Sequence, residues 1–516
     1  MSLTGNHTKK IAKNTLMLYL RQVLVLIVSL FTVRIVLDVL GVEDYGIYNV
    51  VGGIVSFFSF LSGSMASATQ RFFSFALGQN DLERLKKTFT VNLTIYISIA
   101  FIAFILLDTV GLWFVKNYLK LPNERFETIL YIYHFSVFTF VATIVTTPLT
   151  SIIIAHEDMH IYAYMSILET SLKLCVVFLL VYVDFDKLQL YSILLLVVSL
   201  INFTCYFFIC IYKYQECQFN KFYWDKNIFR EVLGFTGWTL FGQITTVGRN
   251  QAITILVNQF FNPITVAARS IAVNITSQIN LFSNNFNTGL YPPLIKAYAS
   301  GNKQEMFALL FNGSKITFFL MWIFALPFYL EMDTILKLWL KEPPEYSVLF
   351  TRLALIESVI MSISLPIATA ARAPGKMRGY ELALGTIQIG IFIASWIILM
   401  MGGNAASVFI VAIVANLLML VVRLIIVGGL IALPLGSFSM KVLLPILLVS
   451  IVSITFSYLI KWMLPIGFLF SFINIFFSII FSSLSMYFIG LDKEMRKKIK
   501  EIFENKILKK YKLNPL

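Results

Sequence analysis

Residues 404–432 read NAASVFIVAIVANLLMLVVRLIIVGGLIA, a run with one charged side chain, Arg423. A helix needs about 20 mostly apolar residues to cross the hydrocarbon core of a bilayer. Applied outward from this run in both directions, the same criterion finds about 14 such stretches. The sequence therefore predicts an all-α polytopic membrane protein.

The composition of the whole chain agrees with this prediction. Of its 516 residues, 58% are hydrophobic and only 13% are charged, whereas a soluble domain carries about 25% charged residues. So few charges cannot cover the surface of a water-soluble chain of this length. A cytosolic enzyme and a nucleic-acid-binding protein are excluded, despite the formal net charge of +14.

The predicted spans are separated by short connections, which leave no room for a large extramembrane domain. They run over residues 12–39, 45–75, 88–115, 127–155, 159–183, 188–212, 229–260, 264–297, 305–331, 346–371, 379–401, 404–432, 439–460 and 464–490. The first, second, seventh and eighth spans are the least apolar. An even number of spans places both termini on one side of the membrane.

The distribution of basic residues predicts which side that is. About 26 Lys and Arg residues fall on the side of the N-terminus and about seven fall on the opposite side. Cytoplasmic loops carry the excess of Lys and Arg, so both termini are predicted to be cytoplasmic. The tail at 491–516 alternates basic and apolar residues, which suits an amphipathic helix on the anionic inner leaflet or a solvated basic tail.

A faint internal repeat, offset by roughly 220 residues, predicts how the chain is divided. The first copy runs from Asn14 to Asn80 and the second from Thr236 to Asn302. Two pseudo-symmetric six-helix lobes follow, with an additional C-terminal helix pair. The predicted parts are an N-lobe at 1–220, a C-lobe at 221–435, the helix pair at 436–490 and the cytoplasmic tail at 491–516.

Charged side chains inside the predicted spans are candidates for function, because each costs about 2.5–3.5 kcal/mol on insertion scales. Arg21, Arg249 and Arg269 have no acidic residue three or four positions away on the same helix. Arg34 has Asp38 four residues on, so a local ion pair is its alternative role. Because bases outnumber acids within the spans, we expect a cavity that suits an anionic substrate.

Amide side chains accompany these arginines in the seventh and eighth spans. They would leave polar groups unsatisfied against lipid, so one face of these spans is expected to meet water; the alternative is that the amides join helices. Guanidinium groups bind phosphate oxygens in a bidentate fork, and amides suit sugar hydroxyls. The candidate residues are Arg21, Arg249, Arg269 and Arg34 for a diphosphate, and Asn250, Asn274, Gln278 and Asn285 for sugar.

One motif resembles a metal site. His156-Glu157-Asp158-Met159-His160 matches the H-E-x-x-H pattern of zinc proteases, but it falls in the short turn between spans four and five, where polar residues are expected. No third ligand has a supporting motif, and no other catalytic motif is present. We therefore predict a protein that is not an enzyme and has no metal or cofactor; a membrane-embedded glycosyltransferase or an H-E-x-x-H protease is the competing class.

The segment Leu40-Gly41-Val42-Glu43-Asp44-Tyr45-Gly46-Ile47-Tyr48 resembles the L-G-x-E-x-Y-G-x-Y signature of bacterial polysaccharide-biosynthesis flippases. These oligosaccharide repeat-unit flippases belong to the multidrug/oligosaccharidyl-lipid/polysaccharide (MOP) exporter superfamily. Residues 49–53 and 68–72 continue the resemblance.

The resemblance implies a function and a location. It implies flipping of an undecaprenyl-diphosphate-type glycan from the cytoplasmic to the periplasmic leaflet of the bacterial inner membrane, by alternating access, for O-antigen, capsule or exopolysaccharide synthesis. Membrane lipids, and polymerases or glycosyltransferases, would be the partners. Arg21, Arg249 and Arg269 would contact the diphosphate, and an H+ or Na+ gradient could drive transport, with Glu357 as the candidate coupling residue.

Two related functions remain as alternatives. The additional helix pair resembles the 14-span arrangement of lipid II flippases, in which the last two helices offer a groove for the lipid tail. A drug/cation antiporter of the same superfamily is the other alternative, and it predicts that acidic residues dominate the cavity.

Overall fold

The computed structural model of the chain describes residues 5–118, 125–217, 222–340, 342–465, 467–493, 495–497 and 500. Within these ranges every regular element is a helix, so the predicted all-α class is confirmed. The predicted amphipathic tail lies outside the described residues from 501 onward, as does the predicted lobe boundary at 220/221.

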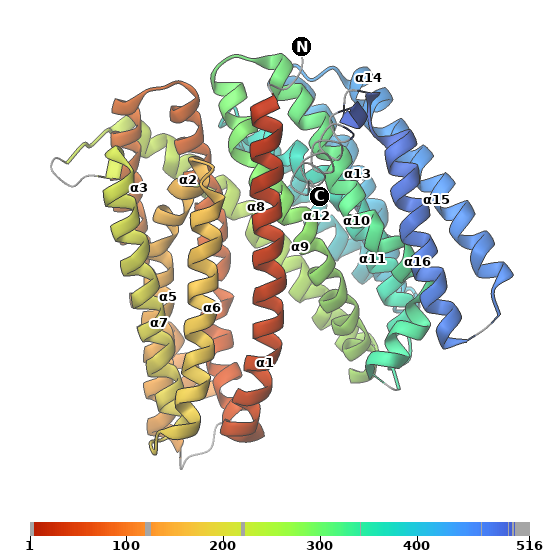
Figure 1. Cartoon of the computed structure of the whole chain (residues 1–516). Helices are drawn as coiled ribbons and strands as arrows, with labels where there is room; N and C mark the ends of the chain where they lie inside the picture. The colour runs from red at the N-terminus through yellow and green to blue at the C-terminus, as the bar shows by residue number, and fades with distance from the viewer. Residues whose placement is uncertain are drawn as a thin grey trace, which may run out of the picture.

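The helices are long and follow one another through short turns (Figure 1). They are α1 (Gly5–Phe57), α2 (Ser59–Gly78), α3 (Leu82–Leu106), α4 (Leu112–Tyr118), α5 (Phe126–Ala155), α6 (Met159–Tyr182), α7 (Lys187–Lys213), α8 (Lys226–Phe260), α9 (Pro263–Ala299), α10 (Lys303–Leu340), α11 (Ser347–Arg372), α12 (Arg378–Met400), α13 (Ser407–Ile431), α14 (Leu435–Phe438), α15 (Leu444–Met463) and α16 (Phe468–Ser485).

The helices agree with the predicted spans. In the described part of the chain, 11 helical segments are long and apolar enough to cross a membrane. Three further long segments, residues 42–78, α8 and α9, bring the total to fourteen. These three are among the four spans that the sequence marks as least apolar. The chain is therefore a polytopic membrane protein.

The first two spans are joined by a single residue rather than by a loop. Gly41 interrupts α1 with φ 78° and ψ 169°, a backbone conformation that residues with a Cβ rarely adopt. The helix resumes at residue 42 in a new direction and is continued by α2 (Figure 1). The glycine of the L-G-x-E-x-Y-G-x-Y segment thus makes the turn between the spans.

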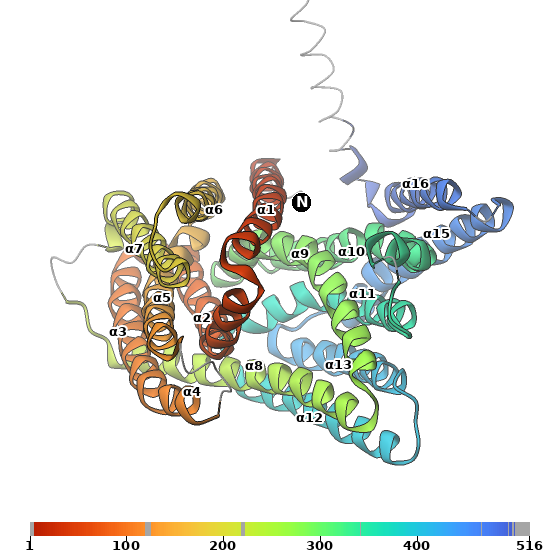
Figure 2. The same ribbon diagram turned by 90° about the horizontal axis from the view of Figure 1, so that it is seen from below.

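Two groups of helices form the body of the molecule. Figures 1 and 2 place α2 to α7 on one side and α8 to α13 on the other, with α15 and α16 at the outer edge beside α10. α1 packs against α5 and α6 of the first group and against α9 of the second. The start of α1 and the end of α16 lie at the same end of the bundle (Figure 1), which we call the terminal end.

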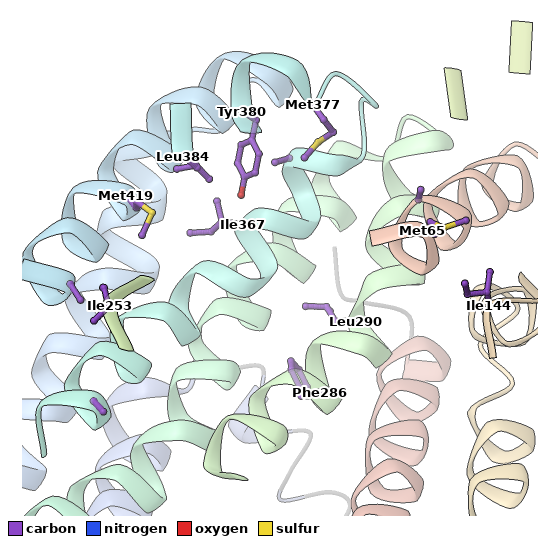
Figure 3. Close-up of a cluster of buried hydrophobic side chains, with 14 of the residues drawn as sticks. Met65, Ile144, Ile253, Phe286, Leu290, Ile367, Met377, Tyr380, Leu384 and Met419 are labelled. Carbon is purple, nitrogen blue, oxygen red and sulfur yellow. The ribbon is translucent and has the colours of Figure 1, made fainter. Parts of the chain in front are cut away.

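The two groups share one apolar core. Figure 3 shows part of it, from Met65 on α2 and Ile144 on α5 through Leu290 on α9 to Met419 on α13. Many large apolar side chains outside this core are exposed, including Leu447 on α15. Such an apolar exterior is expected where helices face lipid.

Gly78 lies where the two groups touch, and it provides a test of this packing. A Cβ at Gly78 would lie 2.8 Å from the Cα and the carbonyl oxygen of Lys296 on α9, which are backbone atoms that cannot move aside. We expect Gly78→Ala to cost roughly 1–3 kcal/mol, as overpacking does, and to lower the unfolding temperature in detergent. Gly53→Ala is the matched control, because nothing lies within 4 Å of its Cβ. Equal unfolding temperatures for the two variants would contradict the close contact between α2 and α9.

Candidate functional site

A cavity of about 210 Å³ lies between α8, α9, α11 and α13. Its charged side chains are Arg249 from α8, Arg269 from α9 and Glu357 from α11. We call it the arginine cavity. It lies toward the end of the bundle opposite the terminal end, because Arg249 is in the second half of α8 and Arg269 is near the start of α9.

Arg249 is held by a neighbouring helix. Its Nη1 lies 3.4 Å from Glu357 Oε1, and its Nη2 donates to Asn250 Oδ1 at 2.9 Å. Glu357 Oε1 also accepts a hydrogen bond from Asn416 Nδ2 of α13, at 3.0 Å. As expected, no acidic residue lies three or four positions from Arg249 on α8. The guanidinium is nevertheless paired, because α11 supplies the carboxylate of Glu357.

Arg269 makes contacts with neutral oxygens. Its Nη1 donates to Thr254 Oγ1 at 2.6 Å and its Nη2 to the carbonyl oxygen of Asn250 at 3.5 Å. The Nε atoms of Arg249 and Arg269 are buried and have no hydrogen-bond partner among the described residues. The arginine cavity therefore holds two guanidinium groups and a single carboxylate, that of Glu357. The Nε–H groups of both arginines remain as donors without an acceptor among the described residues.

Arg21 lies in a second polar cluster, between α1 and α9. Its Nη2 donates to Asn285 Oδ1 at 3.3 Å and to Gln22 Oε1 at 3.1 Å, and its guanidinium lies 4.9 Å from the ring centroid of Tyr162. Arg21 does not line the arginine cavity. It instead joins the first span to the second half of the chain.

The remaining predicted residues are distributed around these two sites. Asn250 lines the arginine cavity, whereas Asn274 and Gln278 are exposed on α9 and do not line it. Arg34 is exposed on α1. The four predicted arginines thus occupy three places instead of one shared cavity.

Sequence reasoning missed Asn416 and Thr254, which bind Glu357 and Arg269. Asn416 is the only amide in the run 407–431, whose other polar residues are Ser407 and Arg423, so its isolation there was an available signal. Thr254 gives no signal, because threonine is common in transmembrane helices.

Polar contacts close the terminal end between the two groups of helices. Glu157, in the turn between α5 and α6, accepts from Lys296 Nζ of α9 at 2.6 Å. We call this ion pair the latch. On the same end Arg71 donates to the Ala373 carbonyl oxygen at 3.0 Å, and the Tyr291 hydroxyl donates to the Ser67 carbonyl oxygen at 2.9 Å.

The H-E-x-x-H residues have separate partners around this latch. His156 Nε2 lies 2.6 Å from Glu216 Oε1, while Glu157 binds Lys296. Burial raises the pKa of Asp158, but hydrogen bonds and charge from Lys213 and Tyr214 outweigh it and hold the pKa below its usual range. In the described ranges no group of three or more His, Cys, Asp or Glu side chains could hold a metal ion. The motif stabilises the turn, as its predicted position between spans suggested.

The structure is thus a membrane-spanning bundle of two groups of helices, with a polar cavity in the second group. A family model, MatE, matches residues 18–179 and 239–380, which is more than half of the chain. The chain belongs to the MatE family, whose members are transporters.

Solved structures share this fold at low sequence identity. An outward-facing multidrug resistance MATE family transporter of the MOP superfamily is 13% identical, with a TM-score of 0.69 over 84% of this chain and 99% of that one. A MATE protein in the bent conformation is 14% identical, with a TM-score of 0.69 over 83% and 99%. No curated protein sequence matches the chain significantly.

A third structure is a MOP superfamily transporter from Pyrococcus furiosus, 13% identical, with a TM-score of 0.64 over 83% of this chain and 97% of that one. That transporter is described as having a binding pocket of reverse polarity, which suggests a different function for it. All three similarities concern the fold.

The latch can be tested as the contact that holds the two groups of helices together at the terminal end. Removing one partner of a buried ion pair costs about 3–5 kcal/mol, so we expect Glu157→Gln to loosen the contact between the turn after α5 and the end of α9. Hydrogen–deuterium exchange of residues 288–302 should rise at least about tenfold. Asp158→Asn is the control, because its partners Lys213 and Tyr214 lie in the same half of the chain. Unchanged exchange in Glu157→Gln would show that the pair does not hold the two groups together.

Proposed function

We propose that this transporter flips an undecaprenyl-diphosphate-type oligosaccharide across the membrane and that the arginine cavity binds its diphosphate. The observation that carries the proposal is the excess of guanidinium over carboxylate in the cavity: Arg249 and Arg269 against Glu357. A net positive cavity at membrane depth attracts an anion and repels a cation.

The geometry of the arginines supports a phosphate ligand. A guanidinium presents five donors in a rigid fork that matches phosphate oxygens. The buried Nε atoms of Arg249 and Arg269 have no acceptor among the described residues, and buried donors are normally satisfied. Phosphate oxygens are the acceptors that would satisfy them.

The size of the cavity limits what it can hold. Its 210 Å³ is below the roughly 300–1,000 Å³ of pockets for drug-sized ligands, so it accommodates a diphosphate but not an oligosaccharide. The sugars would extend toward the exposed amides Asn274 and Gln278, and toward Asn285 beside Arg21. The polyprenyl chain would use an apolar cleft of about 460 Å³ between α10, α11 and α15.

Glu357 is the candidate coupling residue of this proposal. Its carboxylate and a substrate phosphate would compete for the Arg249 guanidinium, so substrate binding would release Glu357 to take up H+ or Na+. Such competition links ion binding to substrate binding.

Orientation and partners complete the proposal. We place the terminal end in the cytoplasm of a bacterial cell, at the inner membrane, on the basis of the Lys and Arg distribution. The latch would then close the cytoplasmic side. Glycosyltransferases would supply the lipid-linked glycan and a polymerase would consume it.

A drug/cation antiporter is the second candidate, and membership of the MatE family together with the fold of a multidrug resistance transporter favours it. In that function Glu357 would bind the cation or proton. Arg249, 3.4 Å from this carboxylate, weakens the attraction for a cationic drug. A lipid II flippase would use the same diphosphate chemistry as the first proposal.

Substitution of the cavity arginines separates these functions. We expect Arg249→Gln and Arg269→Gln each to reduce flipping of a fluorescent undecaprenyl-diphosphate oligosaccharide in proteoliposomes by about tenfold or more, because charged hydrogen bonds contribute about 1.5–3 kcal/mol each. Lysine at either position should restore flipping only in part, since the fork is lost. Arg423→Gln is the control, because Arg423 binds the Ser364 carbonyl oxygen outside the cavity.

Two results would contradict the proposal. One is full flipping by a stably inserted Arg249→Gln/Arg269→Gln double variant. The other is protection of a drug-sensitive host against cationic dyes that is abolished by Glu357→Gln, which would establish the antiporter instead.

A further inference from the structure

A hollow of about 540 Å³ lies between the end of α10 and the turn that joins α15 to α16. It is at the end of the bundle opposite the terminal end, at the outer edge of the molecule (Figure 1). It shares no lining residue with the arginine cavity. We call it the edge hollow.

Buried polar groups form the floor of the edge hollow. Glu331 is 6% exposed and accepts from Asn474 Nδ2 at 2.6 Å, and its Oε1 lies 3.2 Å from Lys461 Nζ. The backbone of α10 leaves helical geometry at Glu331, with φ −110° and ψ 22°. This kink lets Lys461 reach the Leu330 carbonyl oxygen as well.

One acceptor in the floor has no donor. Because Asn474 donates through Nδ2 to Glu331, its Oδ1 is fixed as an acceptor, and it has no hydrogen-bond partner among the described residues. Asn474 is only 1% exposed and lines the hollow. Buried acceptors are normally satisfied, so this atom indicates a ligand that carries an N–H or O–H donor.

The edge hollow is lined by two acidic side chains, Glu331 and Asp333, and by two basic ones, Lys337 and Lys461. Asp333, whose side chain is 57% exposed, pairs with Arg352 at 2.7 Å. Lys337 is exposed and has no ion pair within the described ranges. Among the side chains that the structure describes there, the hollow therefore offers one free cation, Lys337, near a set of acidic and amide oxygens. This arrangement suits a ligand that carries both charges.

The surroundings of the edge hollow indicate where the ligand comes from. Large apolar side chains are exposed beside it on α10 and on both sides of the α15–α16 turn: Leu338, Trp339, Trp462, Met463, Phe468 and Leu469. Exposed tryptophans of this kind lie at the membrane–water interface. The hollow thus opens where lipid headgroups lie.

We propose that the edge hollow binds the headgroup of a zwitterionic phospholipid with a primary ammonium, such as phosphatidylethanolamine. The ammonium would donate to Asn474 Oδ1 and face Asp333, and the phosphate would bind Lys337. A choline headgroup has no N–H donor, and a glycerol headgroup has no cation. This inference is independent of the substrate proposed for the arginine cavity.

Binding to the purified protein in mixed micelles tests the inference. We expect native mass spectrometry to give an apparent Kd for palmitoyl-oleoyl phosphatidylethanolamine about tenfold lower than that for the matching phosphatidylcholine, since one charge-assisted hydrogen bond separates the two. Phosphatidylglycerol should also bind more weakly than phosphatidylethanolamine.

Because Asn474 is buried, a variant at the exposed Lys337 keeps the test independent of folding defects. Asn474→Leu removes the acceptor and should abolish the preference for phosphatidylethanolamine over phosphatidylcholine. Lys337→Gln changes an exposed side chain and should weaken binding of both lipids about tenfold, whereas Lys441→Gln, an exposed lysine at the terminal end, should leave both unchanged. Equal affinities for the two lipids in the unaltered protein, tighter binding of phosphatidylglycerol, or an unchanged Kd in Lys337→Gln would overturn the proposal.

Discussion

The cost of placing charge in hydrocarbon controls where this chain can keep its arginines. Each guanidinium within a span must find oxygen atoms from neighbouring helices or water. Arg249 binds Glu357 and Asn250. Arg269 donates to Thr254, and Arg21 donates to Asn285. These contacts link α1, α8, α9 and α11, so the groups that could bind a substrate also hold the helices in register.

This dual use has a consequence for transport. An arginine that is fully neutralised by a carboxylate cannot attract an anion, and an arginine without partners would destabilise the folded protein. Arg249 and Arg269 lie between these limits, since each makes contacts yet keeps a buried Nε without an acceptor among the described residues. Under the proposed function, such a site would exchange protein contacts for phosphate contacts at a small net cost in free energy.

The helices could be predicted from the sequence because membrane spanning is a local property of an apolar run. All fourteen long helical segments overlap predicted spans, and the turn at Gly41 lies between the first two. The pairing of Arg249 with Glu357 could not be predicted, because 108 positions separate the two residues and only the tertiary arrangement brings their long side chains together. For the same reason the sequence did not indicate that Arg21 lies apart from Arg269.

The turn at Gly41 also constrains how the molecule can move. A loop of several residues would let neighbouring spans shift independently, but one residue has only two rotatable backbone torsions. α1 contacts α9, and α2 contacts both α8 and α9, so a change of the angle at Gly41 would alter the contacts of the first half of the chain with the second. The first two spans therefore form one bent unit between the two groups of helices, and the bend is made by a single glycine, Gly41.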